Sequence, residues 1–330
     1  MRVLITGIDG FVGSHAAELI LRSGAEVHGT IIKGSDARNL AHVRTRLTLH
    51  EVEISDTHQV QALISQVAPE RILHIAGQAF VPNSLQNPME TFQTNVMGGL
   101  NILEAARQLQ ASSGQKRSVL VVSSSEVYGR SAAGQAAITE ATSISPSNPY
   151  AASKASIDLI AQQYAQSFEV DVIVVRPFNH IGSRQNPIFV VSNFAKQFAE
   201  IASGKREPVI YTGNTSVKRD FTNVRDVVRA YWMLFDRNST EVVFNVASGV
   251  PIAISDILQQ LQAISETNVR VESDPERVRD YDVPVVVGSH DRLSQATGWT
   301  PQVPLHETLR EVYSYWVHQM SDARVATSAP

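Results

Sequence analysis

Tyr150 and Lys154 are the two side chains in this sequence best placed to transfer a proton together. They stand four residues apart, so both lie on the same face if the segment is helical. Asn148 can cap such a helix and Pro149 can occupy its first turn, which places the tyrosine at the helix start. A phenol has a pKa of about 10, and a neighbouring ammonium group and the helix N-terminus both favour its phenolate. The spacing predicts an acid–base pair that works near neutral pH.

A tyrosine and a lysine at this spacing also occur by chance, and a second segment favours the catalytic interpretation. The run Ser123-Ser124-Ser125-Glu126 lies at the end of a predicted strand, residues 119–123. Open α/β sheets bind their ligands outside the carboxyl ends of their strands. We therefore expect this run to face the same site as the tyrosine.

Three glycines, Gly7, Gly10 and Gly13, form a motif between the first predicted strand and the first predicted helix, which opens with Phe11 and Val12. Such glycines let the backbone approach a pyrophosphate, whose charge faces the free amide groups at the helix N-terminus. A plain tight turn would also explain three glycines. The position between a strand and an amphipathic helix favours a dinucleotide site.

The choice between NAD and NADP is expected at the ends of the second and third strands. A site specific for NAD usually has a carboxylate at the end of the second strand, and residues 27–33 contain none. Lys33 and Arg38 favour the 2′-phosphate of NADP, although solvated surface charges would look the same. Glu53 and Ile54 are expected to flank the adenine, with a surface acid beside a buried isoleucine as the alternative. NADP is thus the predicted cofactor, with NAD as the second choice.

The elements that position these residues follow an alternating pattern. Short β-branched runs at 2–6, 26–31, 47–54, 71–75, 119–123 and 170–175 predict parallel strands covered on both faces by helices. We expect an α/β fold with a Rossmann-like doubly wound sheet and a smaller C-terminal α/β lobe that binds the substrate. The expected boundaries are 1–178 for the dinucleotide domain, to which 219–247 returns, and 179–218 with 248–320 for the smaller lobe. Residues 321–330 are expected to form a loose tail.

Composition excludes several classes of function. The 330 residues contain no cysteine and carry a net charge of -4, so disulfides, thiolate metal sites and nucleic-acid binding are not expected. The ten histidines are scattered, and no metal is predicted. No apolar run approaches the roughly 18 residues that span a membrane, and the N-terminus leads into a strand without a cleavable signal. These features predict a cytoplasmic enzyme.

Taken together, these motifs resemble the extended short-chain dehydrogenases/reductases that act on nucleotide sugars. The resemblance covers almost the whole chain and rests on the glycine motif, residues 74–78, the serine run, the Tyr150 and Lys154 pair, and residues 176–180, 219–226 and 245–249. It implies that Ser124 contacts the substrate hydroxyl and that Tyr150 and Lys154 are the acid–base pair. It further implies cofactor contacts at Ala76, Gly77, Gln78, Asn95 and Pro177, and substrate contacts at Ser84, Ser125, Glu126, Asn179, Val190, Lys196, Arg219 and Arg279.

Within that family, residues 178–185, 189–197 and 279–284 are most similar to GDP-4-keto-6-deoxy-D-mannose reductases and GDP-mannose 4,6-dehydratases. The similarity implies that Asn179, Arg219 and Arg279 hold the sugar diphosphate, a task that suits the planar fork of arginine. Pairing of the two arginines with neighbouring aspartates is the alternative. Ser183, where a proline is usual, and the Asp280-Tyr281 pair depart from the family pattern.

The implied reaction is NAD(P)H-dependent reduction of the C4 ketone of GDP-4-keto-6-deoxy-D-mannose to GDP-D-rhamnose. Glu126 keeps a dehydratase open, because water elimination needs a base that ketone reduction does not. An epimerase or decarboxylase acting on a UDP-sugar is less favoured. A non-catalytic dinucleotide sensor would have no need of Ser124, Tyr150 and Lys154 together. The family resemblance also implies a homodimer built from helices at 150–166 and 91–109.

Overall fold

Short apolar segments form a seven-stranded sheet in the computed structural model, which describes residues 1–274 and 283–327. Its strands are β1 (Arg2–Thr6), β2 (Glu26–Ile31), β3 (Leu47–Glu51), β4 (Arg71–His74), β5 (Ser118–Val122), β6 (Asp171–Pro177) and β10 (Val243–Val246). They run parallel in the order β10-β6-β5-β4-β1-β2-β3. The predicted α/β class with a Rossmann-like doubly wound sheet is confirmed.

Helices cover both faces of this sheet, because its strands are apolar on both sides. On one face α1 (Phe11–Arg22), the 3₁₀ helix η1 (Arg38–Arg46), α8 (Val224–Leu234) and α10 (Asp291–Thr297) pack over Val3 and Ile5. On the other, α2 (Thr57–Val67), α5 (Gly98–Ser113) and α6 (Pro149–Ser167) pack over Leu4. Alternate residues of one strand therefore serve two separate cores.

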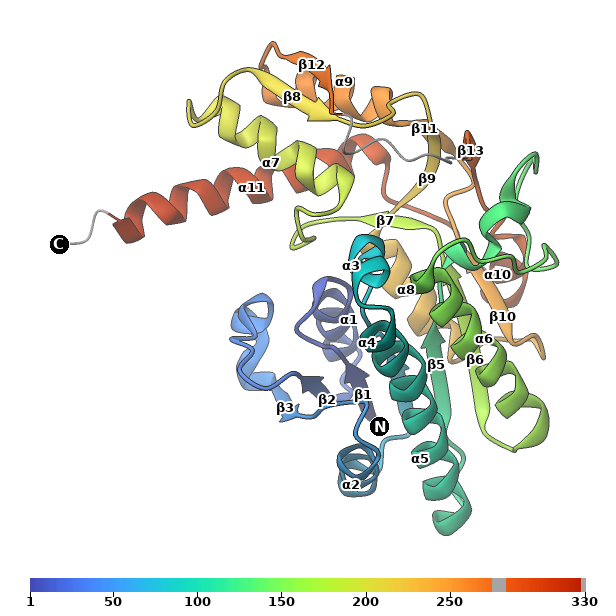
Figure 1. The fold of residues 1–330 in the computed structure, drawn as a ribbon. Helices are drawn as coiled ribbons and strands as arrows, with labels where there is room; N and C mark the ends of the chain where they lie inside the picture. Colours follow the sequence, from blue (N-terminus) through green and yellow to red (C-terminus); the bar gives the residue numbers. More distant parts are fainter. Residues whose placement is uncertain (275–282, 328–330) are drawn as a thin grey trace.

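A smaller lobe lies beyond the carboxyl ends of these strands, above the large sheet in Figure 1. One of its sheets joins β7 (Asn179–Ile181), β9 (Lys218–Asn223), β11 (Pro251–Ala253) and β13 (Val285–Val286), and a second pairs β8 (Val209–Thr212) with β12 (Arg270–Ser273). The helices α7 (Val190–Ala202), α9 (Ile254–Ser265) and α11 (Leu305–Thr327) enclose its apolar core. Only one residue separates β6 from β7, so the small lobe is tied directly to the edge where ligands bind.

The chain passes between the two parts more than once. Strand β9 pairs with strands of the small lobe, whereas α8 and β10, which follow it, belong to the layers of the large sheet. Of the segment 219–247 that was expected to return to the dinucleotide domain, the first residues thus lie in the small lobe's sheet. Pairing of β9 with β7 explains this, because β7 begins just after the large sheet ends.

Four short elements follow β4 and β5. They are α3 (Val81–Gln86), α4 (Pro88–Phe92), the π-helical turn η2 (Gln93–Met97) and the 3₁₀ helix η3 (Ser125–Ala132). The π turn joins α4 to α5 without a break in the helical backbone. Within the described residues, no helix has the length and apolar character needed to cross a membrane.

Candidate active site

The N-terminal turn of α6 places Tyr150 and Lys154 on one buried face. The Asn148 carboxamide oxygen caps the helix by accepting from the Ala151 N–H at 2.8 Å, and Pro149 occupies the first position. Tyr150 is 9% exposed and Lys154 is 6% exposed. The two side chains thus lie in the protein interior at the carboxyl edge of the sheet. The serine run lies at the same edge, because it directly follows β5.

Ser124 connects this run to the tyrosine. Its hydroxyl caps η3 by accepting from the Glu126 N–H at 3.1 Å, and it hydrogen-bonds to the Tyr150 phenol. Burial raises the pKa of Tyr150 to about 12; the Ser124 hydrogen bond opposes this shift and the Glu126 charge adds to it. The expected lowering of the phenol pKa is therefore wrong for this structure, because burial outweighs the favourable contacts. The phenol keeps its proton at neutral pH.

Lys154 is held by a backbone carbonyl. Its ammonium group donates to Val122 O at 2.8 Å, and burial lowers its pKa to about 8. A methyl group on Gly77 would lie 3.4 Å from Lys154 Nζ and 2.8 Å from Asn95 Oδ1. The lysine therefore lies beneath the loop that was predicted to contact the cofactor.

Asn95, in the π turn, fixes that loop. Its carboxamide accepts from Gln78 N at 2.8 Å and donates to Gln78 O at 3.0 Å and to Ser153 Oγ at 2.9 Å. Thr6 supports the loop from below, because its hydroxyl accepts from Ile75 N and Ala76 N, both at 3.1 Å. The widened turn thus lets one buried side chain join the loop after β4 to α6.

Thr6 also explains the state of His74. The threonine hydroxyl, which accepts two N–H bonds, has its own proton left to donate to His74 Nδ1 at 2.8 Å. Burial lowers the pKa of His74 to about 3, so the imidazole is neutral. His74 thus joins the end of β4 to the end of β1 through its hydrogen bond with Thr6.

The glycine motif forms a cradle open to an anion. Gly7 has a φ of +66°, and a Cβ on Gly13 would lie 2.2 Å from Gly7 O, so neither position accepts a side chain easily. Gly10 precedes α1 without any side-chain cap, and the first turn of α1 contains no acidic residue. Free N–H groups at such a helix start suit a pyrophosphate. The residues present therefore fit a dinucleotide.

Other predicted cofactor residues divide between the surface and the interior. Lys33 is exposed, and Pro177 is buried at the end of β6. Glu53 accepts from Ser55 N at 3.2 Å and Ser55 Oγ at 2.9 Å, so it stabilises its own loop. Ile54 is buried against Gly98.

The glycine motif is also in contact with the small lobe. Phe11 stacks on the His180 ring with a centroid distance of 5.9 Å, and Val12 packs against the core of the large sheet. Burial lowers the pKa of His180, and its Nδ1 lies 3.0 Å from Phe178 O. The ring stack thus places β7 directly beside the start of α1.

Among the predicted substrate residues, Ser84 is in contact with Tyr150. It is fully buried, donates to Val81 O at 2.7 Å and accepts from the Tyr150 N–H at 3.1 Å. Ser84 thus helps to fix the backbone of Tyr150 at the start of α6. Ser125 and Glu126 are half-buried beside Ser124, at the edge of the site.

The remaining substrate residues belong to the small lobe. Asn179 is exposed on β7, and Val190, 40% exposed, begins α7. Lys196 forms an ion pair with Glu200 at 3.3 Å and lies over the Trp316 ring.

Arg219 lies on β9, and its Nη1 donates to Lys218 O and Val283 O, both at 2.8 Å. The neighbouring Asp220 carboxylate accepts instead from Ser248, Gly249 and Gly288. Arg279 and the Asp280-Tyr281 pair lie outside the described residues.

Sequence reasoning missed Asp9, which lies inside the glycine motif. Ser35, in the segment after β2, donates its hydroxyl proton to the Asp9 carboxylate, and Asn39 Nδ2 donates to Asp9 O at 2.8 Å. An acid between two glycines of the motif is the signal that could have identified it.

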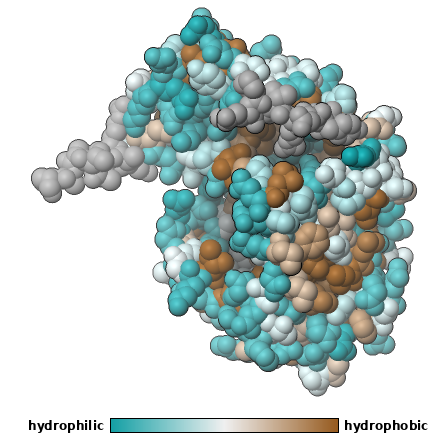
Figure 2. Space-filling view, viewed as in Figure 1, coloured by the Kyte–Doolittle hydropathy of each residue, from teal (hydrophilic) through white to brown (hydrophobic). Residues whose placement is uncertain are grey.

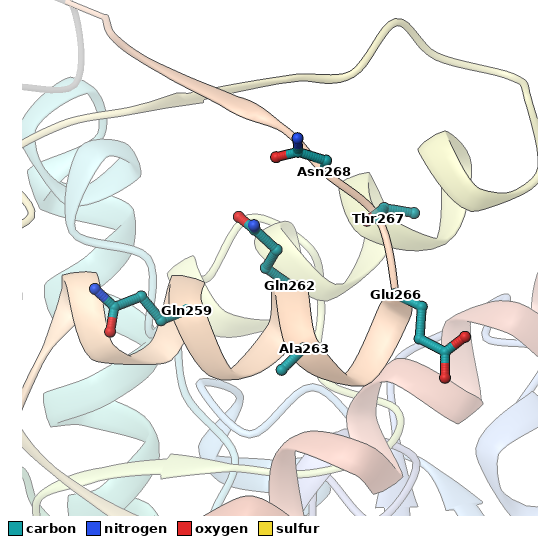
Figure 3. Close-up of a pocket in the computed structure, with 6 residues that line it drawn as sticks. All are labelled: Gln259, Gln262, Ala263, Glu266, Thr267 and Asn268. Carbon is teal, nitrogen blue, oxygen red and sulfur yellow. The ribbon is translucent and has the colours of Figure 1, made fainter.

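A surface pocket of about 390 Å³ lies elsewhere, on the outer side of the small lobe. Figure 3 shows its lining on α9 and the segment that follows, formed by Gln259, Gln262, Ala263, Glu266, Thr267 and Asn268. None of the predicted site residues lines it.

Comparison with known proteins agrees with this geometry. The family model described as GDP-mannose 4,6 dehydratase matches residues 4–312. The chain belongs to this family. The membership predicted from the sequence motifs is confirmed, because the match spans both the large sheet and the small lobe.

Two curated relatives of this chain have different names, one a reductase and the other a dehydratase. A GDP-6-deoxy-D-mannose reductase of Pseudomonas aeruginosa is 32% identical, over 96% of this chain and 97% of its own length. A GDP-mannose 4,6-dehydratase of Vibrio cholerae is 26% identical, over 98% of this chain and 94% of its own length. A solved structure, RMD from Pseudomonas aeruginosa complexed with NADPH, superposes with a TM-score of 0.82 at 31% identity, covering 96% of this chain and 99% of that chain.

Proposed function

We propose that this protein reduces the C4 ketone of GDP-4-keto-6-deoxy-D-mannose to GDP-D-rhamnose, using NADPH or NADH. The observation that carries the proposal is the buried group of Ser124, Tyr150 and Lys154 at the sheet edge, next to a glycine cradle that fits a dinucleotide. The near full-length similarity to the Pseudomonas reductase supports the choice of substrate. Similarity to a structure complexed with NADPH supports the choice of cofactor.

Gly7, Gly10 and Gly13 would hold the dinucleotide, which when bound would supply the hydride for the C4 carbon. The protein supplies the proton, because Tyr150 Oη, protonated at neutral pH, can donate to the carbonyl oxygen as that oxygen becomes negative. Ser124 orients the phenol through their hydrogen bond. The Lys154 ammonium group places a positive charge beneath the loop that carries Gly77. This charge stabilises the phenolate that Tyr150 becomes after it has donated its proton.

Glu126 favours one alternative, a GDP-mannose 4,6-dehydratase. It lies two residues after Ser124 at the edge of the site, where a carboxylate could remove the proton next to a ketone. The family match and the Vibrio relative support this candidate. The higher identity to the reductase makes it the second choice.

Two substrates separate these activities. Purified protein should oxidise NADPH when given the 4-ketosugar, and it should leave GDP-mannose unchanged when no reductant is added. Consumption of GDP-mannose alone would identify a dehydratase instead. Unchanged NADPH absorbance with the ketosugar, beside an active control enzyme, would overturn the reductase.

We also infer a homodimer, supported by apolar side chains exposed on the helices around α6. Met89 is 82% exposed and Leu159 is 55% exposed, with Leu85 and Met97 on neighbouring helices. Figure 2 shows hydrophobic residues gathered on this face of the molecule. A second copy of the chain would cover them.

A further inference from the structure

Asp9 ties the glycine motif to the segment that follows β2. Ser35 Oγ donates to the Asp9 carboxylate, Asn39 Nδ2 donates to Asp9 O at 2.8 Å, and Ile8 N donates to Thr30 O at 3.2 Å. β1 and β2 are adjacent strands of the sheet, as Figure 1 shows. The Asp9 carboxylate therefore lies between the turn after β1 and the loop after β2.

That position has a defined task in sheets of this kind. The ribose of a bound dinucleotide lies near the end of the second strand. There a carboxylate accepts a hydrogen bond from the 2′-hydroxyl of NAD, or a cationic side chain binds the 2′-phosphate of NADP. In this chain β2 ends at Ile31, followed by Ile32 and Lys33. The usual acid is absent from the second strand, and the fold brings the Asp9 carboxylate from the neighbouring turn into contact with Ser35, on the segment that follows β2.

We propose that Asp9 determines the choice between NAD and NADP by favouring the ribose 2′-hydroxyl over a 2′-phosphate. The inference rests on the dinucleotide site of the proposed function. A carboxylate accepts hydrogen bonds from a hydroxyl but repels a phosphate. The hydrogen bond from Ser35 restrains this carboxylate beside the segment that follows β2.

The segment that follows β2 carries charges of both signs. Lys33 and Arg38 are exposed on the same segment and attract a 2′-phosphate. Asp36 is exposed beside them and accepts from the Arg38 N–H at 3.1 Å. Only Asp9 belongs to the glycine turn itself.

The test uses two fragments that differ only at the 2′ position, 5′-AMP and 2′,5′-ADP. Titration calorimetry would measure both dissociation constants for the wild type and for Asp9→Asn, which keeps an oxygen to accept from Ser35 but removes the charge. We expect the preference for 2′,5′-ADP to rise about tenfold, as loss of one nearby like charge predicts. The kcat/KM ratio of NADPH to NADH should rise with it.

Asp36→Asn is the matched control, because it removes an equal charge from the neighbouring segment that follows β2. Its preference should stay within about twofold of the wild type, since Asp36 is exposed and solvent screens its charge, and its carboxylate accepts from the N–H of Arg38 on its own segment. An unchanged preference in Asp9→Asn, or an equal rise in both variants, would overturn the role of Asp9. Asp9→Ser provides a second variant, with circular dichroism to verify its fold.

The same titration separates this inference from the proposed function. Failure of the wild type to bind either fragment would overturn the dinucleotide site and the inference with it. If the protein binds both fragments but does not reduce the ketosugar, only the proposed reaction is overturned. The role of Asp9 in the choice between NAD and NADP is then still decided by the two dissociation constants.

Discussion

At Tyr150, burial dominates the electrostatics. The phenol lies in the interior, its pKa rises to about 12, and the hydrogen bond with Ser124 only partly opposes that shift. A protonated phenol suits the donation of a proton to a forming alcohol. The same residue would serve an oxidation less well, because it would first have to lose that proton.

Removing the phenolic hydroxyl should therefore stop the reaction without unfolding the protein. Tyr150→Phe is expected to lower kcat by about 10²-fold or more, the range usual for general-acid catalysis, while NADPH binding is retained. Rates come from NADPH absorbance, and binding comes from calorimetry.

Tyr164→Phe is the matched control on the same helix. It loses only a hydrogen bond of 3.0 Å to Glu104, so its rate should stay within a few-fold of the wild type. A Tyr150→Phe variant with normal turnover would remove this tyrosine from the mechanism.

The charge on Lys154 predicts the pH dependence. Burial lowers its pKa to about 8, so the ammonium form is present below that pH and lost above it. Tyr150 keeps its proton across this range, because its pKa is about 12. We expect the single-turnover rate to be constant below pH 8 and to fall above it.

Lys154→Arg tests this assignment, because a guanidinium group stays charged to high pH. Its rate should be lower overall but should not fall near pH 8. A wild-type profile that breaks near pH 6 would point to a different titrating group.

The site was predictable from the sequence where it depended on local spacing. The pairing of Tyr150 with Lys154 follows from helical periodicity and the Asn148 cap. The direction of the tyrosine pKa was not predictable, because desolvation depends on what packs over the ring. Ser84 could not be identified as a support for Tyr150 either, since 66 residues separate the two.

One buried ion pair holds α6 against the sheet. Arg176 on β6 donates to both carboxylate oxygens of Asp158 on α6, from Nε at 2.8 Å and from Nη2 at 2.9 Å. Arg176 Nη1 also donates to the Tyr128 hydroxyl at 3.1 Å. The pair therefore fixes the helix that carries Tyr150.

Breaking the Arg176–Asp158 ion pair should lower the free energy of unfolding more than breaking an exposed ion pair. Asp158→Asn leaves the Arg176 charge buried without its partner, and the free energy of unfolding should fall by about 3–5 kcal/mol. Urea denaturation measures this loss. Arg206→Ala, which removes an exposed partner of Glu200, should cost at most about 1 kcal/mol. Equal losses in the two variants would contradict the structural role of Asp158.

The large sheet was predictable because its strands are continuous apolar runs. The strand expected at 47–54 ends at Glu51, because the chain then turns away to reach the Asp56 cap of α2. The strands of the small lobe were not predicted. β9, Lys218–Asn223, is largely polar in sequence, and its strand form depends on pairing with β7, β11 and β13.

The exposed apolar face predicts the assembly state. Leu159→Glu should convert the inferred dimer to a monomer, because it places a charge on the apolar surface that a second copy would cover. Light scattering coupled to gel filtration measures the mass. Val271→Glu, at an exposed position on β12 of the small lobe, should leave the mass unchanged. A monomeric wild type would contradict the dimer.

α8 and β10 follow the first elements of the small lobe in the chain but belong to the layers of the large sheet. The large sheet is therefore incomplete in any fragment that ends before them. A fragment that stops at residue 178 would retain every glycine of the cradle yet expose the hydrogen-bonding edge of β6, which β10 normally covers. Apolar residues of α8, among them Val227, Tyr231 and Leu234, would also be missing from that layer. Such a fragment is expected to self-associate through its open edge. During synthesis, the first six strands must therefore wait for the seventh, made more than sixty residues later, before the edge is protected.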